Sequence, residues 1–202
     1  GLVSIVQVGI GLDRRDNEPA PRCGFWLQAS VRHSATWLGA DYSFVGFNAT
    51  GRGYVPLASS LVIAQRLVAD GVAGDLPIGE LSRVDGTFVY AAYGGVYAGR
   101  GIRVGRYLGR VKVFSQSELR WTPITTSIIG RTLDVGLTGF FDAGVVGMSL
   151  DDLLANATSP RIGTGLGLRA ALNTNFVVRA DVGASPLEGW APRLYLAHGH
   201  VF

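Results

Sequence analysis

The chain has 202 residues, of which 48% are hydrophobic and 16% are charged, and its formal net charge at pH 7 is +3. A soluble domain normally carries about 25% charged residues, so this chain is unusually apolar. A helical membrane protein is excluded, because no stretch approaches the roughly 18 uninterrupted apolar residues that a spanning helix needs. The longest candidate, residues 57–69, is interrupted by Gln65 and Arg66. High hydrophobicity without long apolar runs is typical of a transmembrane β-barrel, whose strands place apolar side chains at every second position.

The charged residues and the cysteine narrow the function classes further. Almost all the positive charge is arginine, Lys112 is the only lysine, and no basic tract is formed, so nucleic-acid binding is not expected. Cys23 stands alone and cannot form an intramolecular disulfide. Residues 1–12 lack the basic start of a signal peptide and already alternate like a strand. Because export requires such a signal, we expect further residues upstream of Gly1.

Read at period two, the chain predicts about nine strands of the length that crosses a bilayer, roughly 9–11 residues each. They are predicted at residues 2–12, 23–33, 40–49, 59–70, 111–121, 131–143, 161–171, 174–184 and 193–202. The pattern is clearest at residues 111–121, 131–143 and 174–184, where one face is apolar and the other carries several charges. This arrangement fits lipid outside and a wet lumen inside. The whole chain, 1–202, is therefore expected to be all-β, part of a transmembrane antiparallel barrel.

Two further features of the sequence stand out. A connection at about residues 72–109 is long enough to be functional. Within the predicted strand 161–171, Gly163, Gly165 and Gly167 share one face, which leaves room for another segment or for tight curvature.

An odd set of about nine strands does not close a bacterial barrel, whose strand number is normally even. An open edge in lipid would leave backbone groups unpaired at several kcal/mol apiece. We therefore expect N-terminal strands that this sequence lacks, supplied by the same chain or by another.

Several sequence patterns imitate functional motifs. Residues 51–54, Gly-Arg-Gly-Tyr, are predicted to form a turn before Pro56. His198 and His200 alternate with apolar residues and are expected to point outward, without binding a metal. The glycines of residues 163–167 are followed by no helix pattern, which argues against a nucleotide site.

Catalysis finds no support in the sequence. There is no nucleophile elbow of the Gly-x-Ser-x-Gly type, and Cys23 lacks any local sign of an activating histidine. Asp151 and Asp152 sit in a connection, where solvation explains them. We expect no enzyme activity and no cofactor.

Five motifs occur in order along nearly the whole chain. They are a turn with Asp13, Arg15, Asp16, Asn17, Pro21 and Gly24; a loop motif with Arg100, Gly101, Ile102, Arg103, Gly105, Arg106 and Tyr107; Glu118 and Arg120 on the next strand; Phe140, Asp142 and Gly144 on the strand after it; and a terminal strand with Leu194, Leu196 and Phe202. Together they resemble the BamA/TamA-like bacterial surface antigen superfamily of outer-membrane assembly and translocation barrels. Ile102 stands where that family usually has an aromatic residue.

The resemblance implies a fold and a setting. These strands would be the last nine of about sixteen, in the bacterial outer membrane. The loop motif would fold back into the lumen, where Arg100 meets Glu118 and Asp142 in charge-assisted hydrogen bonds that pin the loop. The terminal strand, ending at Phe202, would be the signal that the assembly machinery reads.

The resemblance also implies a function and partners. The barrel would help insert or translocate other proteins by opening a weak seam between its first and last strands, with the lipid bilayer, the outer-membrane assembly machinery and nascent outer-membrane proteins as partners. The alternative is a passive channel or membrane anchor of the same superfamily. The domain preceding Gly1 discriminates the two: periplasmic repeats favour assembly, whereas a lipase domain or nothing favours an anchor. A soluble β-sandwich is a third reading, but the charges of residues 111–121 would be costly in its core.

Overall fold

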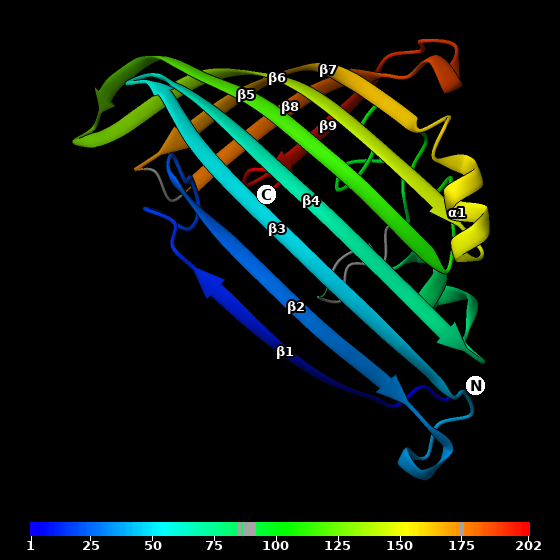
Figure 1. The fold of residues 1–202 in the computed structure, drawn as a ribbon. Helices are drawn as coiled ribbons and strands as arrows, with labels where there is room; N and C mark the ends of the chain where they lie inside the picture. The colour runs from blue at the N-terminus through cyan, green and yellow to red at the C-terminus, as the bar shows by residue number, and fades with distance from the viewer. Residues whose placement is uncertain (85, 87–91, 174–175) are drawn as a thin grey trace.

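A computed structural model of the chain describes residues 1–84, 86, 92–173 and 176–202. In this part of the chain, nine strands form one antiparallel sheet in which each strand pairs with the next along the sequence, in the order β1 to β9. The strands are β1 (Ile5–Asp13), β2 (Gly24–Ser34), β3 (Phe44–Ala58), β4 (Leu61–Gly74), β5 (Val111–Ile128), β6 (Arg131–Gly147), β7 (Arg161–Leu172), β8 (Phe176–Ala184) and β9 (Arg193–His198). Figure 1 shows that the sheet is strongly curved and has a convex and a concave side.

The all-β prediction is confirmed, and the sheet is open. Among the described residues, β1 and β9 pair on one side only and not with each other. No helix in the described ranges is long and apolar enough to cross a membrane.

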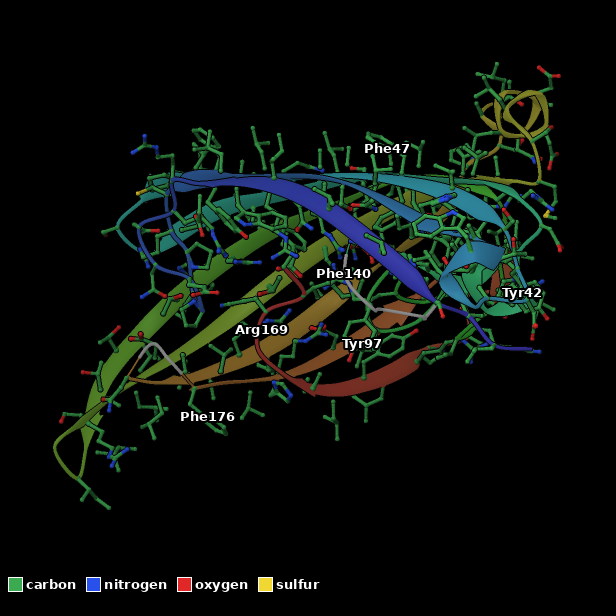
Figure 2. The ribbon with its side chains drawn as sticks, turned by 90° about the horizontal axis from the view of Figure 1, so that it is seen from below. Tyr42, Phe47, Tyr97, Phe140, Arg169 and Phe176 are labelled. Atoms are coloured by element: carbon green, nitrogen blue, oxygen red, sulfur yellow. The ribbon has the colours of Figure 1, made fainter. Side chains whose placement is uncertain are left out.

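The two faces of the sheet differ as the period-two pattern predicts. Phe47 and Phe176 lie on the convex side of the sheet, whereas Phe140 and Arg169 lie on the concave side (Figure 2). We call these the outer and the inner face. Large exposed apolar side chains cover the outer face, among them Val8, Ile10, Leu67, Leu119, Leu137, Leu166, Leu194 and Leu196. The buried charged residues, by contrast, lie on the inner face or in the long connection that packs against it. This separation suits lipid outside, and the strand ladders pair the backbone groups that lipid could not satisfy.

Connections of different length gather at the two ends of the sheet. One end holds the turns at residues 14–23, 59–60 and 129–130, together with Asn173 after β7. The other holds η1 (Thr36–Leu38), the long connection at residues 75–110 with η2 (Ile78–Ser82), helix α1 (Leu150–Asn156) and η3 (Pro186–Glu188). Ser149 caps α1 by accepting a hydrogen bond from the Asp152 N–H at 3.1 Å. Figure 1 shows α1 at this second end and the long connection inside the curve of the sheet.

The observed strand bounds correct several predicted ones. The third to sixth strands extend well beyond their predicted ends, and β4 reaches Gly74, so the long connection begins later than residue 72. The beginning of the predicted strand 174–184 lies outside the described residues.

The turn predicted at residues 51–54 is wrong. These residues lie inside β3, where Gly51 pairs with Leu67 and Gly53 with Gln65 of β4. The two glycines alternate with Arg52 and Tyr54, so the period-two pattern continues through them, and Pro56 is tolerated beside a break in the β3–β4 register.

The chain end also departs from the prediction. The last strand stops at His198, because Gly199 adopts the left-handed region at φ +74° and breaks the alternation of faces. His198 stays exposed as expected, but His200 turns to the inner face, where it lines a cavity with Arg120 and Arg169. Phe202 is buried against Tyr54, Val62 and Ala64 instead of continuing the strand.

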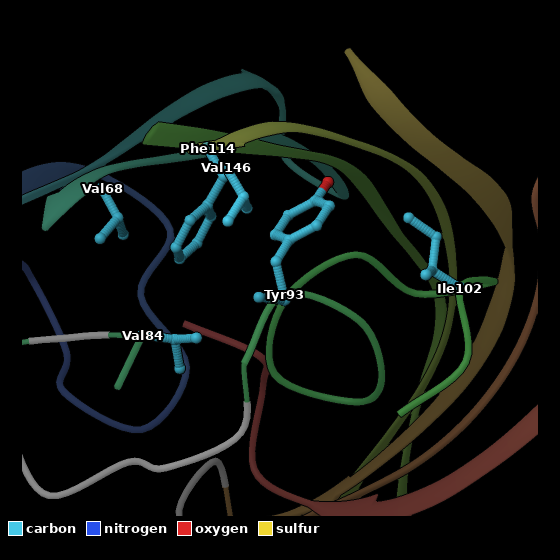
Figure 3. Close-up of a cluster of buried hydrophobic side chains, with 7 residues drawn as sticks. Val68, Val84, Tyr93, Ile102, Phe114 and Val146 are labelled. Atoms are coloured by element: carbon cyan, nitrogen blue, oxygen red, sulfur yellow. The ribbon is translucent and has the colours of Figure 1, made fainter. Parts of the chain in front are cut away.

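A buried apolar cluster joins the long connection to the inner face. Val84, Tyr93, Ala98 and Ile102 of the connection pack on Val68, Phe114 and Val146 of three strands. Figure 3 shows the Tyr93 ring directed toward Phe114 and Val146, with Ile102 farther along the same loop. These described residues of the connection are therefore a packed part of the fold.

Candidate functional site

The long connection ends in a compact segment, residues 93–107, which we call the loop tip. Its base is closed by two backbone hydrogen bonds between Tyr93 and Tyr107, at 3.0 and 3.1 Å. Gly101, with φ +93°, makes the turn that brings Arg100 against the sheet. An L side chain at Gly101 would collide with the backbone of Ala184 at 2.5 Å, so this position requires glycine.

Arg100 is fully buried on the inner face, and its guanidinium meets carboxylates from two strands. Its Nε and Nη2 donate to the two carboxylate oxygens of Asp142 on β6 at 3.0 and 2.8 Å, and its backbone N–H donates to the same group at 2.9 Å. Its Nη1 donates to Glu118 on β5 at 2.6 Å. The structure thus brings together the three residues that the sequence singled out. We call this set the Arg100 latch.

The Phe-x-Asp-x-Gly pattern of β6 has a role for each residue, because all three share the inner face. The Arg100 guanidinium lies 3.7 Å from the centre of the Phe140 ring, a cation–π contact beside the ion pair with Asp142. Gly144 leaves room for Tyr93, whose ring would lie 2.5 Å from any added Cβ. The motif therefore supplies a stacking face, a charge and a space for the loop tip.

One glycine of β7, Gly163, gives the loop tip a similar close approach, and the other two lie against residues of neighbouring strands. A Cβ on Gly163 would lie 1.8 Å from the Arg100 carbonyl oxygen, and one on Gly165 would lie 2.6 Å from Phe140. At Gly167 an added Cβ would meet Asp181. Of the two explanations that the sequence left open for these glycines, the close approach of another segment holds at Gly163.

The latch belongs to a wider charge network that sequence reasoning did not assemble. Asp181 of β8 lies 3.6 Å from the Arg100 guanidinium, and it accepts hydrogen bonds from Arg169 at 2.5 Å and from Arg179 at 2.8 Å. Glu118 also accepts from Arg120 at 2.8 Å. The available signal was the inward position of these residues by period two, but nothing local indicated that they meet.

The other residues of the loop motif have different surroundings. Ile102 is buried in the apolar cluster, and Tyr107 packs against that cluster. Gly105 adopts φ +69° with open space around it. Arg103 and Arg106 are exposed. The Arg103 N–H and the Arg106 guanidinium both donate to Glu188.

A second charge cluster, which the sequence did not reveal, holds the beginning and the end of the long connection. Arg32 of β2 binds Asp70 of β4 through two hydrogen bonds, at 3.0 and 3.2 Å, and donates to Glu80 of η2 at 3.1 Å. Lys112 lies 3.4 Å from Asp70 and donates to the carbonyl of Gly109 at 2.7 Å. The long connection is thus bound to the sheet near its two ends as well as at the loop tip.

The turn motif forms a self-contained hydrogen-bonded unit at the end with the shorter connections. Arg15 makes a two-point contact with the Asp13 carboxylate at 2.9 and 2.6 Å. The Asp16 carboxylate accepts from the N–H groups of Arg22 and Cys23, and Asn17 caps the N–H of Ala20. Pro21 is buried. Gly24, at φ +97°, lies so close to Arg14 that an added Cβ would be 2.0 Å from its carbonyl oxygen.

The residues of the predicted terminal strand lie on both sides of the sheet. Leu194 and Leu196 are exposed on the outer face. Phe202 lies inside, where its carbonyl accepts a hydrogen bond from Arg120 at 3.0 Å and its ring lies 5.2 Å from the Arg120 guanidinium.

This arrangement holds a loop and presents charge, and it offers little for bond-breaking chemistry. Arg100 is locked by carboxylates on both sides, so it cannot move without leaving buried charges unpaired. In the described ranges, no group of three or more His, Cys, Asp or Glu side chains is placed to hold a metal ion.

Comparison with known proteins agrees with this geometry. Residues 2–187 match the model of the Omp85 superfamily domain. No curated protein matches the chain. Among solved structures, the chain is similar to the crystal structure of BamA from Haemophilus ducreyi lacking POTRA domains 1–3, with 15% identity and a TM-score of 0.69 over 96% of this chain. The chain spans 41% of the length of that BamA chain, and at this identity the likeness shows the fold.

The family match, which extends over most of the chain, settles its class. Barrels of this family are non-enzymatic transporters and assembly factors of the outer membrane, so the expectation that the chain is no enzyme is confirmed by membership. The nine-stranded sheet, its apolar outer face and its charged inner face are the corresponding part of such a barrel. The chain belongs to the Omp85 superfamily.

Proposed function

We propose that this chain forms the C-terminal part of a barrel that assists the insertion or translocation of proteins at the outer membrane. The observation that carries the proposal is the edge strand β9. It has six residues, pairs only with β8 among the described residues, and is followed at once by the left-handed Gly199. A short edge strand separates easily from a neighbour, and its free N–H and C=O groups can template an incoming strand.

Further strands complete the barrel in this proposal. Edges such as those of β1 and β9 are not viable in lipid unless they are paired, because each unpaired backbone group costs several kcal/mol. Strands from the same chain or from another therefore bring the total to about sixteen, and the first of them meets β9 at the seam.

The outer face and the chain end define the remaining partners. The apolar outer face contacts the lipid bilayer. Leu194, Leu196 and Phe202 form the signal read by the outer-membrane assembly machinery when this barrel is itself assembled. The direction of Leu194 and Leu196 toward the outside supports their recognition, since a machinery that receives the strand from lipid meets that face first.

The Arg100 latch keeps the loop tip inside the lumen and maintains the shape of the barrel. Support comes from the contacts of Arg100 with β5 and β6, which tie two adjacent strands to one loop residue. Guanidinium–carboxylate hydrogen bonds of this kind are stronger than neutral ones.

The function is tested by reconstituting the full-length protein in liposomes and measuring the insertion of a nascent barrel substrate. We expect faster insertion than into empty liposomes of the same lipid. Equal rates in the two preparations contradict the assembly function.

The alternative is a passive channel or membrane anchor of the same superfamily. The loop tip packed inside the sheet is expected for an anchor as well, because the tip fills the pore under either function. Replacing Arg100 by Ala should raise single-channel conductance under either function. The discriminating results are substrate insertion and the domain that precedes this segment: periplasmic repeats favour assembly, and a lipase domain favours an anchor.

A further inference from the structure

The loop tip contacts the edge strand β9 directly, in addition to its latch on β5 and β6. The Tyr195 side chain, 8% exposed, points from β9 to the inner face. Its hydroxyl oxygen accepts a hydrogen bond from the Gly101 N–H at 2.9 Å and donates to the Ile102 carbonyl at 3.3 Å. Both partners follow Arg100 immediately in the chain. The position of Arg100 in its latch therefore determines whether Tyr195 has these partners.

A second contact connects the loop tip to the beginning of β9. Glu188, the last residue of η3, accepts hydrogen bonds from the Arg103 N–H at 3.1 Å and from the Arg106 guanidinium at 2.9 Å. Its other carboxylate oxygen accepts from Arg193, the first residue of β9, at 3.2 Å. The Glu188 side chain is 4% exposed, whereas the side chains of its partners Arg106 and Arg193 are 38% and 31% exposed. One carboxylate thus links the tip to the beginning of the edge strand.

These contacts matter more for β9 than for any interior strand. β9 pairs with β8 over residues 193–198, whereas β5 pairs with β6 over almost its full length of 18 residues. An interior strand has ladders on both sides, but β9 has one in the described part of the chain. A few hydrogen bonds from the loop tip are therefore a large share of what holds β9 in place.

We propose that Tyr195 and Glu188 are positioning residues through which the docked loop tip holds the edge strand β9 against β8, so that withdrawal of the tip loosens β9. The significance of β9 as a seam rests on the proposed function, but the coupling itself does not. The lumenal loop then does more than fill the pore. It sets the ease with which the sheet edge opens to a partner strand.

The test is hydrogen exchange of the β9 amides in the full-length protein in liposomes. Tyr195→Phe keeps the ring and removes both hydrogen bonds of the hydroxyl. Because one neutral hydrogen bond changes an opening equilibrium by about five-fold, we expect β9 amides to exchange at least about five times faster. Exchange at the wild-type rate overturns the proposal.

Tyr93→Phe is the matched control. The Tyr93 hydroxyl donates to the Arg161 carbonyl at 2.9 Å, so it is also a bond from the loop tip to the wall, but at the interior strand β7. We expect β9 exchange in this variant to stay at the wild-type rate. If Tyr93→Phe accelerates β9 exchange as much as Tyr195→Phe does, the effect is a general loosening and the specific coupling is wrong.

A double-variant cycle separates coupling from a local role of the tyrosine. In the Arg100→Ala background the tip is released, so Tyr195→Phe should add little further acceleration at β9. Fully additive effects would show that Tyr195 acts without the tip, which contradicts the proposal. Glu188→Gln tests the second contact between the loop tip and β9. It should accelerate β9 exchange when Arg100 is present and should not do so in the Arg100→Ala background.

The result of the hydrogen-exchange test does not depend on the result of the insertion assay. A wild-type protein that inserts no substrate refutes the proposed function, whereas the exchange rates still report whether the tip holds β9. Conversely, active wild-type protein with unchanged exchange in Tyr195→Phe and Glu188→Gln refutes the coupling alone.

Discussion

Replacing Gly163 by Ala should expel the loop tip from the inner face through a single methyl group. The added Cβ would lie 1.8 Å from the Arg100 carbonyl oxygen and 3.0 Å from its carbonyl carbon. Ordinary van der Waals contact needs about 3.5 Å. Both colliding groups are fixed to backbone, one in a strand and one in a turn beside a latched side chain, so no rotamer change relieves the clash.

The size of the effect follows from the cost of overpacking, about 1–3 kcal/mol in well-packed sites. A backbone clash this short belongs at the upper end, and about 3 kcal/mol lowers the ratio of docked to undocked tip by a factor of about 100. Hydrogen exchange of the Arg100 and Gly101 amides measures this ratio, because both N–H groups donate to inner-face acceptors only when the tip is docked.

Gly139→Ala is the control, since a Cβ there meets only Leu166, at an ordinary 3.9 Å. It should leave the exchange of both amides unchanged and slightly stabilise the strand, as alanine does relative to glycine. Wild-type protection of Arg100 and Gly101 in Gly163→Ala would refute the conclusion that the tip lies against β7.

Two other perturbations address the charges around the loop tip. Asp142→Asn removes the main partner of Arg100 and leaves a buried guanidinium underpaired, which should destabilise the docked tip by about 3 kcal/mol and raise single-channel conductance; unchanged conductance argues against the latch. At Glu188, the hydrogen bond from the Arg103 N–H lowers the carboxyl pKa, burial opposes this shift, and the charges of Arg106 and Arg193 lower the pKa further. Because the pKa is depressed in the folded protein, this contact is complete above the ordinary carboxyl pKa, about 4.3, and is lost as the pH falls through the lowered value. Exchange of the Arg103 amide should therefore stay slow at pH 5 and quicken relative to the intrinsic rate in stronger acid, and Glu188→Gln should abolish that transition.

Much of the wall could be predicted from the sequence, because the direction of a side chain in a strand is a local property. Alternation at period two placed Glu118 and Asp142 on the inner face and Leu119 and Phe141 on the outer one, and the structure agrees. The observed order β1 to β9 is the meander that consecutive antiparallel strands joined end to end form. The prediction for the chain end failed because one backbone angle overrides the pattern: Gly199 turns His200 and Phe202 inward although the alternation runs on.

The site around the loop tip could likewise be predicted only in part. The order of motifs along the chain indicated that Arg100 returns to the sheet, and residue chemistry indicated carboxylates as its partners. The roles of Asp181, Tyr195 and Glu188 could not be predicted, because each lies more than 80 positions from its loop partner in sequence and no local pattern records that distance in space.

What the sequence determined by itself is the alternation of the strands, which face carries the charged residues and which residue types are available for a latch, since these depend on neighbours along the chain. Only the tertiary structure decided which carboxylates surround Arg100, that Gly163 receives its carbonyl, and that the loop tip touches the last strand. The physical reason is that the curl of the sheet brings β5 to β9 around one loop, and that curvature is a property of all the strands together.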